Sequence, residues 1–130
     1  MKSVLVIEDN PDNLCLISYA LKRSGFTVIC AESGELGIEL ALKERPDIII
    51  MDIMLPGIDG IEATRRIRAS ELDGLVPIIA MTSYAMRGDR EIILAAGCNG
   101  YIEKPIDPLQ VVEQIQAIIQ GGVHEGPGRR

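Results

Sequence analysis

Aromatic residues are scarce in this sequence, which has one Phe, three Tyr and no Trp among 130 residues. The hydrophobic fraction is nevertheless 47%, so the core has to be built from Ile, Leu, Val, Met and Ala. Together with 25% charged residues, this composition is typical of a folded globular chain and excludes a disordered one. The length fits one compact domain.

Long apolar runs are absent too, since no stretch approaches the roughly 20 residues of a membrane span. The N-terminal run before Glu8 and Asp9 is too short for the apolar region of a secretion signal. We therefore expect a cytoplasmic protein without a membrane contact. An excess of positive charge is also missing, because the net charge is −6. Direct, non-specific nucleic-acid binding needs a basic face, so this charge argues against it.

Cysteine and histidine are rare. The three cysteines, Cys15, Cys30 and Cys98, are odd in number and form no CxxC pair, so we expect reduced, buried, small apolar side chains. The one histidine, His124, lies in GGVHEGPGRR, residues 121–130, where five of ten residues are Gly or Pro. This composition predicts a flexible tail or the start of a linker, so the domain is expected to span residues 1–120. A catalytic role for His124 is not expected.

Five short apolar runs predict β-strands, and they are Val4–Ile7, Phe26–Ala31, Asp47–Met51, Val76–Met81 and Gly100–Ile102. The apolar residues in these runs are continuous instead of alternating. This pattern indicates strands that are covered on both faces, and hence a parallel sheet.

Helical patterns lie between these runs. Asn10 and Ser33 are typical capping residues before two of the helices, and the dipeptide Asp107-Pro108 predicts the start of the last. Two further helices are predicted over Gly60–Ala69 and Arg87–Ala96. Periodicity predicts inward-facing side chains at Leu36, Leu40, Ala41, Leu109, Val112, Ile115 and Ile119, and largely exposed ones at Arg65, Arg66 and Arg68. The alternation of strand and helix, repeated five times, predicts an α/β protein with a doubly wound parallel sheet.

Functional groups of such sheets lie beyond the carboxyl ends of the strands. Glu8 and Asp9 follow the first predicted strand, Asp52 the third, Thr82 the fourth and Lys104 the fifth. Asp52 stands out because it ends an apolar run, and a buried charge costs several kcal/mol unless it is paired, hydrogen-bonded or metal-bound. We expect these groups to converge.

Their chemistry is coherent. Three clustered carboxylates raise one another's pKa unless a cation lies among them, and oxygen ligands favour Mg²⁺. Lys104 can pair with one carboxylate, and Thr82 supplies a hydroxyl donor. An Asp carboxylate can attack phosphorus while a metal and a lysine stabilise the phosphoryl oxygens. The residues alone therefore predict a phosphoryl or metal site.

Four motifs carry a family resemblance: VLVIEDN, DIIIMDIMLPGIDG, PIIAMTSYA and AAGCNGYIEKPID. In this order and spacing, the chain resembles the response-regulator receiver domain of two-component signalling from Lys2 to about Gln120. The resemblance implies a flavodoxin-like (βα)5 fold with strand order 2-1-3-4-5. It also implies a cis bond between Lys104 and Pro105.

The resemblance implies a role for each matching site residue. Asp52 would be the phosphoacceptor, and Lys104 would contact the phosphoryl group. Asp9, Asp52 and the backbone carbonyl of Met54 would bind Mg²⁺ or Mn²⁺, with Glu8 acting through a water.

The resemblance also implies partners and a switch. A histidine kinase or histidine phosphotransfer protein would donate the phosphoryl group, and Thr82 and Tyr101 would be the switch residues. The face formed by the fourth helix, fifth strand and fifth helix would then bind a downstream protein effector. Met54 and Tyr84 would modulate the phosphate lifetime. The protein would catalyse only its own phosphorylation and dephosphorylation, as a monomer or a phosphorylation-dependent dimer.

Three alternatives compete with this reading. An aspartyl-phosphate phosphatase or phosphotransferase of the haloacid-dehalogenase type needs a second Asp where Met54 stands. A flavin- or nucleotide-binding module needs a Gly- or Ser/Thr-rich loop after the first strand, where the sequence reads EDNPDN. A degenerate receiver acting as a constitutive docking module is disfavoured by the intact acids, Thr82 and Lys104.

Overall fold

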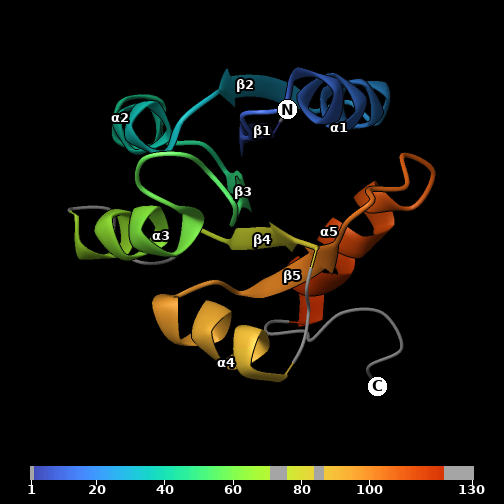
Figure 1. Ribbon diagram of the computed structural model, residues 1–130. Helices are drawn as coiled ribbons and strands as arrows, with labels where there is room; N and C mark the ends of the chain where they lie inside the picture. Colours follow the sequence, from blue (N-terminus) through green and yellow to red (C-terminus); the bar gives the residue numbers. More distant parts are fainter. Residues whose placement is uncertain (1, 71–75, 84–86, 122–130) are drawn as a thin grey trace.

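The computed structural model describes residues 2–70, 76–83 and 87–121 (Figure 1). Strands and helices alternate in the order β1 (Ser3–Ile7), α1 (Pro11–Arg23), β2 (Thr27–Ala31), α2 (Gly34–Glu44), β3 (Ile48–Asp52), α3 (Gly60–Ala69), β4 (Ile78–Thr82), α4 (Arg87–Ala96), β5 (Gly100–Glu103) and α5 (Val111–Gly121). The strands form one parallel sheet in the order β2-β1-β3-β4-β5, which confirms the predicted fold.

β3 and β4 each end one residue later than predicted, and this difference bears on function. β3 includes Asp52, which lies opposite Met81, and β4 includes Thr82, which lies opposite Glu103. Both side chains are therefore placed by sheet hydrogen bonding and not by a loop.

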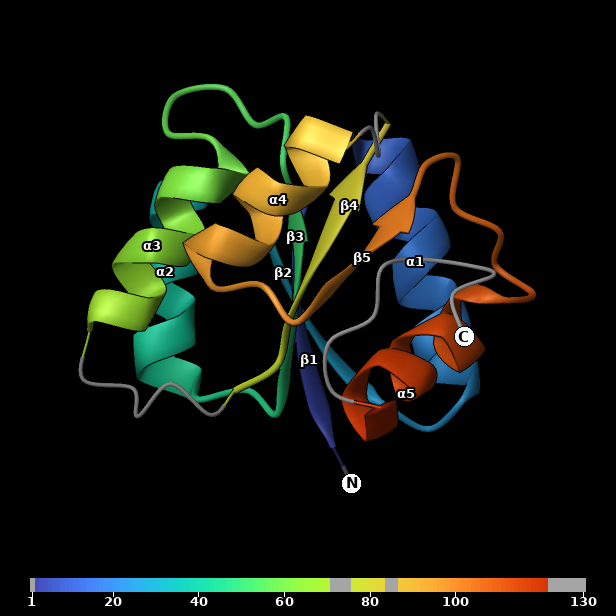
Figure 2. The ribbon, with the colours of Figure 1, turned by 90° about the horizontal axis from the view of Figure 1, so that it is seen from below.

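The sheet separates two layers of helices, with α1 and α5 on one face and α2, α3 and α4 on the other (Figure 2). Alternate residues of each strand reach opposite layers. Val4 and Val6 pack in the cluster under α1 and α5, whereas Leu5 and Ile7 pack in the cluster on the opposite face. This arrangement explains why the strands read as continuous apolar runs.

The predicted caps at Asn10 and Ser33 are present. The Asn10 side chain accepts hydrogen bonds from the backbone N–H groups of Asp12 and Asn13, at 2.9 and 3.0 Å, and Pro11 is the first residue of α1. Ser33 Oγ accepts a hydrogen bond from Leu36 N at 3.1 Å, at the start of α2. The cap at Asn10 begins α1 directly after Glu8 and Asp9.

The prediction for the start of α5 was wrong. The helix begins at Val111, because Asp107 closes a turn in which its side chain accepts a hydrogen bond from Leu109 N at 2.9 Å. Leu109 thus lies outside the helix and is 89% exposed. Leu36, also predicted to face inward, is 40% exposed in the first turn of α2.

Arg68 was predicted to be exposed and is instead half-buried. It donates hydrogen bonds from Nε to the Gly97 carbonyl at 3.0 Å and from Nη2 to Asn99 Oδ1 at 2.9 Å. Asn99 Oδ1 also accepts from Ile78 N at 2.9 Å. A side chain of α3 therefore holds the connection between α4 and β5.

Burial was wrongly predicted for two of the cysteines. Cys98 is buried, but Cys15 and Cys30 are exposed. Cys30 lies on β2, the edge strand of the sheet, where the strand has a neighbour on one side only. Cys15 lies on the part of α1 beside that edge.

The C-terminal boundary was predicted after residue 120. α5 includes Gly121, and the rest of the predicted tail with His124 lies outside the described residues. Within the described part of the chain, no helix has the length and apolar character needed to cross a membrane.

Candidate functional site

Three carboxylates meet at the carboxyl ends of β1 and β3. Ligand oxygens of Glu8, Asp9 and Asp52 lie within 4.8 Å of one another. Glu8 and Asp52 are each 1% exposed, whereas Asp9 is exposed. The acids predicted from three separate motif positions therefore form one cluster.

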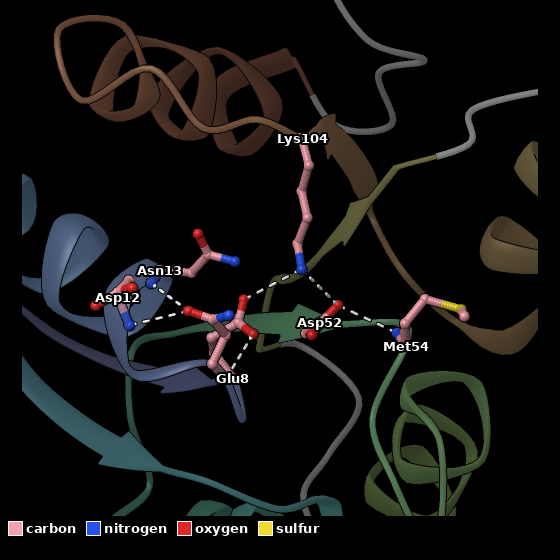
Figure 3. A network of polar contacts seen from close by, with 7 residues as sticks. Glu8, Asp12, Asn13, Asp52, Met54 and Lys104 are labelled. Atoms are coloured by element: carbon pink, nitrogen blue, oxygen red, sulfur yellow. Dashed lines mark hydrogen bonds and ion pairs between the residues drawn. The ribbon is translucent and has the colours of Figure 1, made fainter.

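Lys104 reaches this cluster from the end of β5 (Figure 3). Its Nζ lies 3.1 Å from Asp52 Oδ1 and 3.3 Å from Glu8 Oε1. Its backbone N donates a hydrogen bond to the Thr82 carbonyl at 2.8 Å, which ties the lysine to β4. The bond to Pro105 is cis, as expected.

Burial and neighbouring charges shift the pKa values of Glu8 and Lys104. Burial raises the pKa of Glu8, and the neighbouring Asp52 raises it further, against the hydrogen bond from Asn10 N and the charge of Lys104. Burial alone would lower the pKa of Lys104, but the hydrogen bond and charge of Asp52, together with Glu8, outweigh it and raise that pKa. Lys104 is therefore a fixed cation at neutral pH.

The cluster fits a hard divalent cation. Glu8 Oε1 is a buried oxygen that accepts no hydrogen bond within the described structure, although Lys104 Nζ lies 3.3 Å away. Three carboxylates share this one ammonium group, so negative charge is in excess. Oxygen-only ligands and an open, exposed side at Asp9 are what Mg²⁺ with retained waters requires.

Met54 lies two residues after Asp52 in the sequence. Its backbone N donates a hydrogen bond to Asp52 Oδ1 at 3.1 Å, while its side chain is 66% exposed and points away from Asp52 (Figure 3). The side chain lines a pocket of about 300 Å³ beside the cluster, together with Ile53, Ile61, Thr82, Asp89, Ile92 and Ile93.

The two predicted switch residues lie on β4 and β5. Thr82 is 5% exposed at the end of β4, next to the cluster on the sheet. Tyr101 is 4% exposed and packs in the cluster that α2, α3 and α4 cover. Tyr84, the second predicted lifetime modulator, lies outside the described residues.

Two residues that support the site were not predicted to do so. A Cβ on Gly60 would collide with the Asp52 carbonyl oxygen and come within 2.7 Å of Ile53 Cα, so only glycine lets α3 start against the end of β3. Asn10, predicted only as a cap, also donates its backbone N–H to Glu8 Oε2 at 3.1 Å. For Gly60, the available sequence signal was its position directly after Asp59 at the start of a predicted helix.

The fold and the site together define a doubly wound parallel sheet with a carboxylate cluster and a lysine at its carboxyl edge. The chain belongs to the response regulator receiver domain family, whose family model matches residues 4–116. It is thus a receiver domain of the kind found in two-component response regulators.

Individual relatives agree with this assignment. The polar-differentiation response regulator DivK of Brucella ovis is 39% identical over 118 residues, which cover 91% of this chain and 96% of that protein. A receiver domain of a sensor histidine kinase from Pseudomonas aeruginosa PAO1 is 40% identical, with a TM-score of 0.83 over 92% of this chain and 98% of that one. That structure has a magnesium ion coordinated in its active-site cleft. The chemotaxis protein CheY4 of Vibrio cholerae has a TM-score of 0.87 at 26% identity, covering 91% of this chain and 98% of that one.

Proposed function

We propose that the protein accepts a phosphoryl group on Asp52 from a phosphohistidine of a histidine kinase or histidine phosphotransfer protein. The observation that supports this most is the position of Lys104, whose Nζ lies 3.1 Å from Asp52 Oδ1 inside an acidic cluster. The resemblance to response regulators such as DivK supports the class of donor. A cytoplasmic location is part of the proposal.

In the proposed transfer, a carboxylate oxygen of Asp52 forms a bond to phosphorus as the bond from phosphorus to the donor's imidazole nitrogen breaks. Lys104 stabilises the charge on the phosphoryl oxygens and is already held at Asp52. Asp9, Asp52 and the Met54 carbonyl would hold Mg²⁺ or Mn²⁺, with Glu8 acting through a water. When bound, the metal supplies a Lewis acid for the phosphoryl oxygens.

The proposed output is a shift between two conformations. The hydroxyl of Thr82 would bond to a phosphoryl oxygen, and this would stabilise one arrangement of Tyr101 and of the face formed by α4, β5 and α5. A downstream protein effector would read that face, with the receiver as a monomer or a phosphorylation-dependent dimer. Tyr101 is buried in the structure, which is the inward arrangement that the proposal assigns to the phosphorylated state.

Met54 and Tyr84 would set the lifetime of the phosphate by shielding it from water, which predicts slow autodephosphorylation. The Met54 side chain points away from Asp52, so shielding by this residue requires a rotation of the side chain toward the carboxylate (Figure 3). Decay of the phosphorylated protein should accelerate in Tyr84→Ala and Met54→Ala. Unchanged decay in both variants would refute the shielding role.

The central test is incubation with acetyl phosphate and Mg²⁺, followed by intact mass. The wild type should gain one phosphoryl group and Asp52→Asn none. Asp12→Asn is the matched control, because Asp12 is an exposed acid in the first turn of α1 and should leave the gain unchanged. Phosphorylation that persists in Asp52→Asn, or none in the wild type, would contradict the proposal. The second result would instead favour the docking-module alternative.

The enzymatic alternative is tested with the same protein. A phosphatase would release many equivalents of phosphate from an aryl phosphomonoester, whereas a receiver that catalyses only its own modification should not turn over. Met54 in place of an acid, with an outward-pointing side chain, favours the receiver.

A further inference from the structure

Two exposed cysteines share a pocket between α1 and the edge strand β2. Cys15 of α1 and Cys30 of β2 both line a hollow of about 430 Å³, together with Ser18 and Lys22. The two thiols come from elements that are neighbours in the fold, and fourteen residues separate them in the sequence. Nothing in the receiver chemistry proposed above uses either of them.

The packing directs both thiols toward the same place. Ser18 Oγ lies 3.6 Å from Cys30 Sγ, and Cys15 is three residues before Ser18, one helical turn away on the same side of α1. On β2, Val28 packs in the cluster with α1 while Ile29 packs in the opposite cluster. Since side chains alternate along a strand, Cys30 faces α1 as Val28 does.

We propose that Cys15 and Cys30 are a redox-active pair that closes to an intramolecular disulfide in the presence of a low-molecular-weight disulfide of the glutathione type. One protein thiolate attacks the glutathione disulfide, which forms a mixed disulfide and releases one glutathione thiolate. The second protein thiolate then attacks the protein sulfur of the mixed disulfide and releases the second glutathione. The two cysteines lose two electrons and two protons, and the glutathione disulfide gains them.

Cys98 provides an internal contrast. Its thiol is 4% exposed and lies 3.8 Å from Thr64 Oγ1, and burial raises its pKa to about 11. A buried, protonated thiol is a poor nucleophile, so it should stay reduced under conditions that oxidise the exposed pair.

The pair also lies beside the segments that hold Glu8. The carbonyl of Ala31, the residue after Cys30, accepts a hydrogen bond from Glu8 N at 2.9 Å. Asn10, the cap of the helix that carries Cys15, donates its N–H to Glu8 Oε2 at 3.1 Å. A disulfide would therefore link α1 to β2 beside β1, the strand that ends at the acidic cluster.

The test is oxidation of the full chain with oxidised glutathione, followed by non-reducing intact mass and a tryptic map. Cleavage after Lys22 or Arg23 places Cys15 and Cys30 on separate peptides, so the disulfide appears as one linked pair. The wild type and Cys98→Ser should lose two hydrogens and show that linked pair. Cys15→Ser and Cys30→Ser should each stop at a mixed disulfide with one glutathione. The thermal unfolding midpoint of the oxidised wild type should rise by several degrees and return on reduction.

A variant with the same number of thiols tests the geometry. Cys30→Ser combined with Thr27→Cys moves the thiol to the exposed start of β2, three positions along the strand and so on its other face. This variant should end as mixed disulfides. The proposal is overturned if it closes as readily as the wild type, or if the wild type gives only mixed disulfides, intermolecular dimers, linkage to Cys98 or no reaction. Because the readout is mass and needs neither Mg²⁺ nor phosphorylation, it is independent of the role of Asp52.

Discussion

Asp9 differs from the two other acids of the cluster because its side chain is exposed, whereas those of Glu8 and Asp52 are buried and contact Lys104. Without metal, Asp9 adds a like charge beside two carboxylates that are already in excess over one ammonium group. With metal bound, Asp9 would be one of the proposed ligands. The same side chain should therefore oppose folding in one condition and support it in the other.

We expect Asp9→Asn to raise the free energy of unfolding by about 1 kcal/mol in metal-free buffer, because it removes a repulsion between carboxylates whose oxygens lie within 4.8 Å of one another. The same variant should lose most of the stabilisation that Mg²⁺ gives to the wild type, since only the folded state presents the site. Urea unfolding with a chelator and with Mg²⁺ measures both effects. Asp12→Asn removes an acid from the first turn of α1, so it should not raise the stability, and it should keep the full effect of Mg²⁺. An Asp9→Asn protein that is less stable without metal yet still stabilised by Mg²⁺ would contradict the assignment.

Cys98 should make the stability depend on alkaline pH. Burial raises its pKa from the ordinary 9.0 to about 11 in the folded protein. The unfolded chain therefore loses the thiol proton at lower pH than the folded one, so the stabilising contribution is complete below about pH 9 and is lost as the pH rises toward 11. At about 1.4 kcal/mol per unit of pKa, the loss amounts to about 2–3 kcal/mol.

The measurement is the free energy of unfolding of the wild type and of Cys98→Ala from about pH 8 to about pH 11, under reducing conditions. Tyrosine and lysine residues titrate in both proteins, so the difference between the two curves isolates the thiol. That difference should shrink as the pH rises. Parallel curves would show that folding does not change the pKa of the Cys98 thiol.

At the scale of the elements, Arg68 joins three of them. From α3 it contacts the Gly97 carbonyl and Asn99 Oδ1, and Asn99 in turn accepts a hydrogen bond from Ile78 at the start of β4. Gly97 has a φ of 117°, and a Cβ there would come within 2.8 Å of Arg68 Cγ, so the turn after α4 is shaped around this side chain. The guanidinium makes these bonds from two different nitrogens, Nε and Nη2, held in a rigid plane, whereas an ammonium group has to donate from a single nitrogen.

Arg68→Ala should lower the free energy of unfolding by about 1–3 kcal/mol, because it removes two hydrogen bonds and leaves partly buried acceptors without this donor. Arg68→Lys should recover only part of the loss. Arg66→Ala is the control on the same helix, since Arg66 pairs with Glu62 at 2.9 Å on the exposed side and its removal should cost about 0.5 kcal/mol or less. Equal losses in Arg68→Ala and Arg66→Ala, measured in urea, would show that the contacts of Arg68 carry no stability.

The elements show what periodicity can and cannot predict. The five strands and the caps at Asn10 and Ser33 followed from local signals, namely apolar runs and side chains that bond to their own helix. The start of α5 did not, because Asp107 can cap a helix or close a turn, and only the packing of Val111 and Ile115 decides between them. Arg68 and Cys30 were misplaced for a similar reason, since their surroundings come from distant segments.

The acidic site was predictable to a greater degree, because a parallel sheet brings every strand end to one edge. The residues Glu8, Asp9, Asp52 and Lys104 were found from their positions at those ends, and the contacts among them agree. The exposed orientation of the Met54 side chain and the close approach of Gly60 depend on how the β3–α3 segment folds back. Sequence spacing does not encode that path.

At the scale of the whole molecule, the proposed route from Asp52 to the face formed by α4, β5 and α5 would run through two buried side chains, Thr82 and Tyr101. Thr82 ends the strand between β3 and β5, and Tyr101 packs in the same cluster as Ile93 of α4. If the change in conformation depends on the hydroxyl of Thr82, removal of that hydroxyl should leave phosphorylation of Asp52 intact. The face formed by α4, β5 and α5 should then no longer respond to it.

We therefore expect Thr82→Val to be phosphorylated by acetyl phosphate but to show a change in hydrogen exchange over α4 and β5 that is several-fold smaller than in the wild type. Thr82→Ser, which keeps the hydroxyl, should restore most of that change. Thr64→Val is the matched control, because it removes another fully buried threonine hydroxyl, on α3 beside Cys98 and away from Asp52. It should respond to phosphorylation as the wild type does. If Thr82→Val transmitted the full change, the path would not use this hydroxyl. The ion pair between Asp52 and Lys104 at the end of β5, which the variant preserves, would then be a link that can carry it.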